Sequence, residues 1–432
     1  MKPSVLLISV DAVNPDFIFH QAEKGLKLPN IQKIFLENGT YSTNGMRSIF
    51  PTFTYPCHHS MITGTCSSTH GVYNNIMFDP IGQYKSAWHW FVSDRVENLW
   101  SAAHKNGYIT SSVAFPVSVG AEGDFIIPEF WYCGKNIDEK FINAVSYPRN
   151  LVHEVYQKLG NFPTGKQLLE DSDVVRYQTT KWILENKIAP MASDKPFFMT
   201  TYFASYDEVT HRCGVGSDRA MRSLEAIDTM VGDLVETVDR LSHGNYVVCL
   251  ASDHGSLDTQ YNINPNVILH RAGLIDVDAS GNVVDWKAYS QRAGGCSEIR
   301  LRDGNDQETY NTVYRLLKEL EEDPNSGIAK VLDRKELDKR KAFPLATFAL
   351  VAKKGYEILD HVNTDYMPKT NRQAAQHGFD NDYPEMRAIF LIAGSGIPKG
   401  HTISDVELID IAPTLANIMG FILPQAEGKN LL

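Results

Sequence analysis

The chain has 432 residues, of which 43% are hydrophobic, and it carries a formal net charge of -11 at pH 7. This length suits one large α/β domain with an insertion, or two domains, and the hydrophobic content supports a sizeable core. The acidic balance excludes a nonspecific grip on nucleic acid or anionic lipid, because the long-range field repels phosphates. If the partner is a small phosphate ester, bound metal cations must reverse this charge locally.

No stretch approaches the roughly 18 apolar residues that cross a bilayer, and residues 1–3 lead directly into a strand-like run. We therefore predict no membrane span and no signal peptide. The six cysteines, Cys133 among them, are scattered without paired spacing, which indicates reduced thiols in a cytoplasmic protein. The oligomeric state stays open.

Apolar, β-branched runs alternate with helical patterns along most of the chain, and this rhythm predicts a doubly wound, mostly parallel central sheet flanked by helices. All the apolar runs are interpreted as buried parallel strands. The predicted strands are residues 5–10, 109–115, 197–203, 246–251 and 388–393, and the predicted helices are 29–38, 173–186 and 218–241.

The alternation lapses for about a hundred residues after Ser256. This region has a β-like stretch, charged helical patterns at 310–322 and 335–341, and another strand at 346–352. We predict an inserted α+β cap at 259–369, with the catalytic core formed by 1–258 and 370–432.

Acidic and histidine residues follow the predicted strands, and in open α/β sheets ligands bind beyond the carboxyl ends of the strands. We expect these side chains to share one rim, with His377 reaching it from the loop before strand 388–393. The others are Asp11 after strand 5–10, Asp207 and His211 after 197–203, and Asp253 and His254 after 246–251.

The local spacing of these residues suits metal binding. Asp207 and His211 are four apart, which puts both on one face of a helical turn. Gly255 is expected to let the chain turn so that Asp253 and His254 both aim inward. Each motif alone is more often structural. Together, carboxylate oxygen and imidazole nitrogen predict zinc first, with manganese or iron as alternatives.

The stretch 49–75 also contains Cys57, His58, His59 and Cys66, which invite a zinc-site interpretation. They lack a spacing with a second ligand pair, so we interpret them as a packed or solvated start of a helix.

Four motifs resemble a known family. Residues 54–58 (TYPCH), followed by Thr-Gly at 63–64 and His-Gly at 70–71, match a nucleophile segment Thr-Phe-Pro-Asn-His. The others are DEVTHRCG at 207–214, SDHG at 252–255 and HGFDN at 377–381. From about residue 5 to 420 the chain resembles the type I phosphodiesterase/nucleotide pyrophosphatase family of the alkaline phosphatase superfamily.

The resemblance implies an alkaline-phosphatase-like fold with two divalent metal ions. Thr54 would be the nucleophile, placed near the start of a helix that Pro56 begins and turned into an alkoxide by a metal ion. Asn75, rather than Asn74, would donate to a phosphate oxygen. Tyr55 would stack on a substrate base, with simple packing as the alternative. The implied ligands are Asp207, His211 and His377 for one ion, and Asp11, Asp253, His254 and the Thr54 oxygen for the other.

The implied reaction is metal-dependent hydrolysis of phosphodiester or pyrophosphate bonds in nucleotide-type substrates, through a covalent phosphothreonine. The alternatives are C–P hydrolysis of phosphonates or phosphomonoester hydrolysis at the same site. A non-catalytic, metal-stabilised binding protein is a third hypothesis. No arginine lies in the nucleophile segment, which favours diesters, although one from elsewhere in the chain stays open.

Two departures from the family pattern concern the substrate. The family's Asp-Gly after the first strand is Asp11-Ala12, and its Trp-Pro-Gly-Ser segment appears as AFPVSVGAEG at 114–123. We expect the base or leaving-group pocket to be remodelled there.

Overall fold

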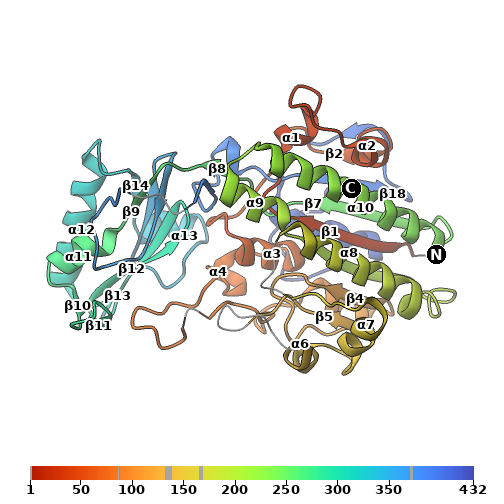
Figure 1. Cartoon of the computed structure of the whole chain (residues 1–432), viewed down its shortest axis with the longest axis horizontal. Coiled ribbons are helices and arrows are strands. Elements are labelled where there is room, and N and C mark those ends of the chain that lie inside the picture. The colour runs from red at the N-terminus through yellow and green to blue at the C-terminus, as the bar shows by residue number, and fades with distance from the viewer. Residues whose placement is uncertain (1, 86, 132–138, 165–168, 370–372) are drawn as a thin grey trace.

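The computed structural model describes every residue except 1, 86, 132–138, 165–168 and 370–372, so Cys133 lies outside the described residues. Figure 1 shows a large core with a central sheet, and a smaller cap that projects from one end of the core. The cap is built from the middle of the chain, and the C-terminal segments return to the core.

An eight-stranded sheet forms the centre of the described core, in the order β19-β2-β18-β7-β1-β6-β4-β5. β1 pairs in parallel with β6 and β7, and β4 pairs in parallel with β5 and β6. The strands are β1 (Ser4–Val10), β2 (Gly39–Tyr41), β4 (Ile109–Val113), β5 (Phe125–Ile127), β6 (Phe197–Phe203), β7 (Tyr246–Ala251), β18 (Phe390–Gly394) and β19 (His401–Thr402).

The prediction that strand 388–393 is parallel was wrong, because β18 is antiparallel to both β7 and β2. The chain returns from the cap at the rim where the parallel strands end, since His377 lies there before β18. The strand that follows must therefore run in the opposite direction. The sheet remains mostly parallel, and every residue of β1 and β6 is buried, as expected for strands covered on both faces.

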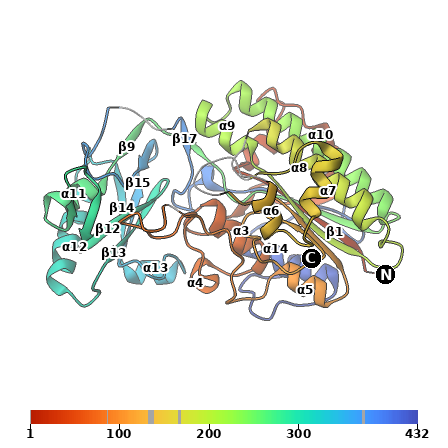
Figure 2. The same cartoon turned by 60° about the horizontal axis from the view of Figure 1, so that its bottom comes forward.

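Helices cover both faces of the sheet, with α8, α9 and α10 on one side and α3, α5 and α14 on the other (Figure 2). The predicted helix 218–241 is confirmed as α10, whereas 29–38 forms a short helix that continues as a π-turn, η1. The core helices are α1 (Pro15–Phe19), α2 (Pro29–Ile31), η1 (Gln32–Leu36), α3 (Thr54–Thr63), α4 (Ser67–His70), α5 (Leu99–Lys105), α6 (Glu139–Val145), α7 (Leu151–Leu159), α8 (Glu170–Ile183), η2 (Leu184–Ile188), α9 (Ser205–Cys213), α10 (Asp218–Leu241), η3 (Pro384–Met386), η4 (Leu408–Asp410) and α14 (Ile411–Met419).

The cap contains an antiparallel sheet in the order β12-β13-β15-β14, with its own hydrophobic clusters. Phe78 and Phe379, from outside residues 259–369, pack into one of these clusters, so core segments help to complete the cap. The cap elements are β10 (Ile275–Val277), β11 (Val283–Trp286), β12 (Ala288–Ala293), β13 (Cys296–Leu301), β14 (Ile328–Leu332), β15 (Phe348–Ala352), α11 (Pro265–Arg271), α12 (Gln307–Glu322) and α13 (Arg334–Lys339).

Short strand pairs join the remaining segments. β8 (Leu257–Asp258) pairs with β17 (Ala375–Gln376), where the chain leaves for the cap and returns from it. β9 (Tyr261–Ile263) pairs with β16 (Tyr356–Ile358), and β3 (Met46–Arg47) pairs with β20 (Val406–Glu407).

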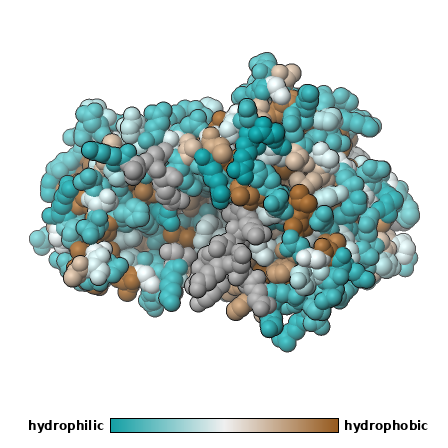
Figure 3. Space-filling model, in the orientation of Figure 1, coloured by the Kyte–Doolittle hydropathy of each residue, from teal (hydrophilic) through white to brown (hydrophobic). Residues whose placement is uncertain are grey.

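Hydrophobic side chains are scattered among hydrophilic ones on the face shown in Figure 3, and its described residues show no large continuous hydrophobic area. None of the described helices is long and apolar enough to cross a membrane. All five described cysteines are free thiols.

Candidate active site

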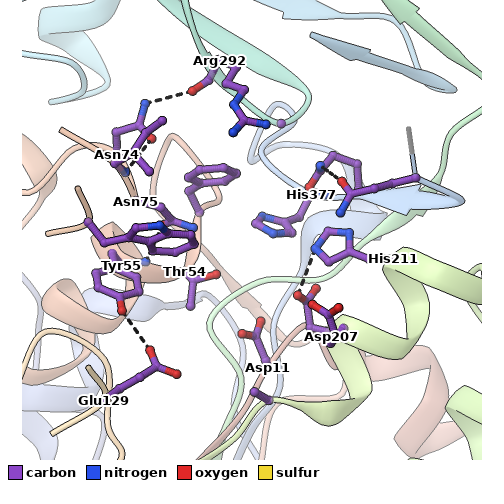
Figure 4. Close-up of a pocket in the computed structure, with 18 of the residues that line it drawn as sticks. Asp11, Thr54, Tyr55, Asn74, Asn75, Glu129, Asp207, His211, Arg292 and His377 are labelled. Atoms are coloured by element: carbon purple, nitrogen blue, oxygen red, sulfur yellow. Dashed lines mark hydrogen bonds and ion pairs between the residues drawn. The ribbon is translucent and has the colours of Figure 1, made fainter. Parts of the chain in front are cut away.

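A pocket of about 240 Å³ opens at the carboxyl ends of β1, β6 and β7, between the core and the cap. Figure 4 shows Thr54, Tyr55 and Asn75 on one side of it and Asp207, His211 and His377 on the other, with the cap residue Arg292 above. The site therefore lies where the strand-end rule placed it.

The structure brings the six predicted carboxylate and histidine residues into one buried cluster. β1, β6 and β7 are neighbours in the sheet, so the residues that follow them meet at one rim. The His254 and His377 rings stack with centroids 3.9 Å apart. The shortest acid–histidine distances are His211 Nε2 to Asp207 Oδ2 (3.0 Å), His254 Nε2 to Asp253 Oδ2 (3.1 Å) and His254 Nε2 to Asp11 Oδ1 (3.5 Å).

All three clustered histidines are oriented by a backbone carbonyl. Because a carbonyl oxygen can only accept, Nδ1 of each ring carries a proton and Nε2 points into the cluster. Burial disfavours the charged form of His211, but the charge and hydrogen bond of Asp207 raise its pKa to about 9, so a cation bound there would replace the Nε2 proton. The Nδ1 atoms donate to Ala375 O at 2.7 Å from His211, to Gly255 O at 3.1 Å from His254, and to Thr52 O at 3.0 Å from His377.

Three carboxylate oxygens of the cluster are buried without a hydrogen bond: Asp11 Oδ1, Asp207 Oδ1 and Asp253 Oδ2. Buried anionic oxygens without a hydrogen bond are costly unless a cation binds between them. The ligand atoms form two groups, Asp207/His254/His377 and Asp11/Asp253/His254, each spanning less than 4.8 Å. The residues present therefore fit a pair of divalent metal ions, with His254 between the two groups and His211 beside Asp207.

The pKa values show how closely these charges are packed. Burial, reinforced by the charges of Asp253 and Asp207, raises the pKa of Asp11 well above its ordinary value. Burial also raises the pKa of Asp253 to about 8. Burial opposes ionisation of Asp207 as well, but the charge and hydrogen bond of His211 hold its pKa below the usual range. Burial lowers the pKa of His377 to about 4, so its ring is neutral near pH 7.

Thr54 is the first residue of α3, so its hydroxyl lies at the helix N-terminus, and helix formation begins two residues earlier than Pro56 suggested. Proline is tolerated in this first turn, where its missing N–H has no helical partner. Thr54 Oγ1 lies 3.4 Å from His254 Nε2, and the side chain is 7% exposed. The Thr54 hydroxyl thus lies between the cluster of six carboxylate and histidine residues and the pocket.

His58 positions the nucleophile segment. Its Nδ1 donates to the Thr54 carbonyl at 2.8 Å, and its Nε2 accepts from Ser9 Oγ at 2.8 Å. Both ring nitrogens are used, so His58 has no free lone pair for a metal. Within the described residues, Cys57, His59 and Cys66 form no metal-type group either.

The two neighbouring asparagines differ in their hydrogen-bond partners. Asn74 Nδ2 donates to the Arg292 carbonyl at 3.1 Å, so its amide group is engaged by the cap. Asn75 Oδ1 accepts from the Tyr55 N–H at 2.8 Å, which leaves its NH₂ group as the donor facing the pocket. This arrangement agrees with the predicted donor role of Asn75, which stays a prediction.

Tyr55 borders the pocket but is only 1% exposed. Its hydroxyl donates to Glu129 Oε2 at 3.0 Å, and its ring packs edge-on against Trp88 at 5.2 Å between centroids. Trp88 and Trp131 also line the pocket, so they offer the aromatic surface that we had assigned to Tyr55. Trp88 lies between α4 and α5 and Trp131 follows β5, outside the named helices and strands, so no sequence periodicity marks them.

The backbone explains how this site tolerates its unusual residues. Ala12 adopts φ 63°, where glycine is favoured, and its N–H donates to Asp253 Oδ1 at 3.2 Å. Asp253 and His254 meet in one ligand group next to Gly255, although Gly255 does not adopt a positive φ. It is glycine because a Cβ there would lie 2.1 Å from the Glu385 carbonyl oxygen. Within segment 114–123, Val117 has φ 56°, yet the segment does not line the pocket.

Comparison with known proteins gives a consistent result. Residues 5–380 match the family model described as type I phosphodiesterase / nucleotide pyrophosphatase. The chain is 22% identical to human bis(5'-adenosyl)-triphosphatase ENPP4, over 97% of this chain and 79% of that protein. It is 25% identical to mouse ectonucleotide pyrophosphatase/phosphodiesterase family member 1, over 99% of this chain and 42% of that protein.

Solved structures of murine ectonucleotide pyrophosphatase/phosphodiesterase 5 have the same fold. One has a TM-score of 0.67 at 19% identity, covering 99% of this chain and 97% of that one. An inactive threonine-to-alanine variant of the same murine protein, in complex with AMP, has a TM-score of 0.66 at 18% identity, with 99% and 98% coverage.

Proposed function

Because the chain belongs to the type I phosphodiesterase/nucleotide pyrophosphatase family, with its alkaline-phosphatase-like α/β fold, we propose that it hydrolyses phosphodiester or pyrophosphate bonds of nucleotide-type substrates. The reaction proceeds through a covalent phosphothreonine on Thr54 and uses two divalent metal ions, with zinc as the first choice. The substrate is a small phosphoryl ester, and we expect no stable binding of nucleic acid.

One observation carries this proposal: six carboxylate and histidine side chains form a buried cluster in which three carboxylate oxygens lack hydrogen bonds, and His254 Nε2 of this cluster lies 3.4 Å from Thr54 Oγ1. These six residues would hold the divalent cations, whose positive charge would favour loss of the hydroxyl proton and offset charge on phosphoryl oxygens. The AMP bound by a threonine variant of a structural neighbour supports the same assignment.

The residues of the chain then act in two steps. Thr54 Oγ1 forms a bond to phosphorus in line with the leaving oxygen, whose bond to phosphorus breaks as the hydroxyl proton is lost. Water then cleaves the Oγ1–P bond and restores the hydroxyl, so each turnover consumes one water. The Asn75 NH₂ group donates to a nonbridging oxygen, since its Oδ1 is held by the Tyr55 N–H.

His58 and the helix orient the nucleophile. The bond from His58 to the Thr54 carbonyl holds the first turn of α3, and the helix N-terminus places positive dipole charge beside the attacking oxygen.

The test is hydrolysis of a nitrophenyl nucleotide diester by metal-loaded protein, with phosphonoacetate and a nitrophenyl monoester at equal concentration. We expect the diester to react fastest, and acid quenching to trap a phosphorylated peptide that contains Thr54. Thr54→Ala should abolish both signals, while Thr69→Ala, on α4 outside the pocket, should retain them. A monoester or phosphonate preference would instead select one of the alternative reactions.

Stoichiometric metal without turnover of any phosphoryl substrate would support a binding protein instead. The cytoplasmic location stays a prediction.

A further inference from the structure

Arg292 reaches the pocket from the cap, and nothing in the proposed mechanism uses it. It lies near the end of β12, one residue from the Gly294-Gly295 turn. Asn74 donates to its carbonyl at 3.1 Å, and Gly295 N donates to the His377 carbonyl at 2.8 Å. These two bonds hold the backbone of the turn beside the active site, so the position of the Arg292 Cα is fixed.

The guanidinium group of Arg292 is only weakly engaged. Among the described residues its one ion pair is with Asp360, at 3.6 Å from Nε to Oδ2. This long contact uses Nε and leaves the two terminal amino groups for a ligand. The side chain is 34% exposed and borders the same pocket as Thr54 and Asn75 (Figure 4).

The charges around the pocket make Arg292 the expected contact for an anionic group of the substrate. Its described lining includes the carboxylates of Asp11, Glu129, Asp207, Glu208 and Glu357, but only one arginine and no lysine. The clustered acids and histidines serve the reacting phosphoryl group, so any further anionic group of the substrate meets Arg292 as its permanent cation. A guanidinium fork matches the oxygens of a phosphate bidentately.

We propose that Arg292 binds a phosphate in the leaving group of the substrate. This inference rests on the proposed function and deepens it: the preferred substrates are phosphoric anhydrides, such as nucleoside triphosphates, in which the scissile phosphorus is followed by another phosphate. Simple diesters with an uncharged leaving group react at the same Thr54 but gain nothing from Arg292.

Two substrates separate this role from a general one. Thymidine 5′-triphosphate and the p-nitrophenyl ester of thymidine 5′-monophosphate transfer the same thymidylyl group to Thr54, but they release pyrophosphate and nitrophenol respectively. Arg292→Ala should lower kcat/KM for the triphosphate about 10- to 100-fold, the effect of losing charge-assisted hydrogen bonds, and change the nitrophenyl ester less than about threefold. Arg292→Lys should give an intermediate loss, because charge remains without the fork.

Calorimetric binding supplies a readout that does not depend on turnover. In a Thr54→Ala background, Arg292→Ala should weaken binding of thymidine 5′-triphosphate by a similar factor and leave thymidine 5′-monophosphate binding within about threefold. Arg302→Ala is the matched control, because Arg302 lies in the same cap but pairs with Asp285 on its surface. It should change neither substrate nor ligand.

The outcomes separate the two proposals. Equal losses on both thymidylyl substrates, or no loss on either, would overturn the role of Arg292 while leaving the hydrolase intact. A wild-type protein that hydrolyses neither substrate would refute the proposed function, and the binding measurement would then decide the role of Arg292 alone. The truncation keeps the Asn74 bond to the Arg292 carbonyl, so the melting temperature should hold.

Discussion

The two walls of the pocket are built in different ways. On the core wall, metal-type side chains follow three adjacent parallel strands, are buried, and are oriented by carbonyl contacts such as that of His211 with Ala375. On the cap wall, Arg292 stands beside a turn that is held through its backbone, and its side chain has one long ion pair. The side chains of the core wall are thus held in place by burial and hydrogen bonds. The Arg292 side chain of the cap wall is less restrained, so a substitution there should alter substrate choice without disturbing the core wall.

The largest effect should follow a change in the core wall. Asp253→Asn removes a charge shared by the ligand cluster, so metal content and turnover should fall at least about 100-fold, as elemental analysis and a diester assay would show. Because repulsion and burial already raise the pKa of Asp253, the metal-free variant should keep its melting temperature. Asp276→Asn, at an exposed cap position, is the control. Full activity in Asp253→Asn would contradict the shared ligand cluster.

The second-largest effect should come from the turn at Gly294, where the cap contacts His377 of the core. Gly294 has φ +68°, and a Cβ there would lie 2.2 Å from the His377 carbonyl oxygen. Gly294→Ala should therefore displace the turn and lower the activity. It should also lower the free energy of unfolding by about 2–3 kcal/mol. Gly273→Ala is the matched control, since Gly273 has φ +71° with nothing within 4 Å. It should cost only the backbone strain, about 1–2 kcal/mol. Equal losses in urea unfolding would mean that the close approach is unimportant.

Acid should loosen the core before the cap. Burial, with a contribution from His89, lowers the pKa of His59 from 6.5 to about 3, whereas the cap histidines His270 and His361 are not buried. Below about pH 6.5, His59 binds a proton in the unfolded chain but stays neutral in the folded core. The free energy of unfolding should therefore fall as pH drops from about 6.5 towards 3, by up to about 1.4 kcal/mol per pH unit for each such histidine.

Hydrogen exchange at about pH 7 and pH 5 would measure this difference, with faster exchange expected in α3 peptides than in β13 or β15 peptides at the lower pH. His59→Gln should reduce the pH dependence of urea unfolding, while the exposed His401→Gln should not. Equal acid sensitivity of core and cap peptides would remove this distinction.

The smallest effect should come from Ala12. Its φ of 63° is strained for alanine, so Ala12→Gly relieves strain but adds freedom to the unfolded chain. The two effects oppose each other, and the free energy of unfolding should change by less than about 1 kcal/mol, with unchanged turnover. A large loss of turnover would show that the Ala12 methyl group supports the core wall.

Local patterns predicted much of the core wall but little of the cap wall. β6 and β7 have the predicted bounds, because runs rich in apolar and β-branched residues end shortly before the polar ligands. The direction of β18 could not be read this way, since it depends on where the chain re-enters the sheet. Trp88, Trp131 and Arg292 had no signal, because the two tryptophans lie outside the named helices and strands and Arg292 lies near the end of a cap strand, and long-range packing decides where each meets the pocket.

The sequence by itself determined the fold class, the family and the set of acid and histidine side chains at the strand ends, because these follow from local periodicity and short motifs. Only the tertiary structure decided which hydrogen bonds separate Asn75 from Asn74, that His58 bonds to the Thr54 carbonyl, and that an arginine of the cap lines the same pocket as Thr54. Those assignments depend on hydrogen bonds between residues far apart in the chain, which no local pattern records.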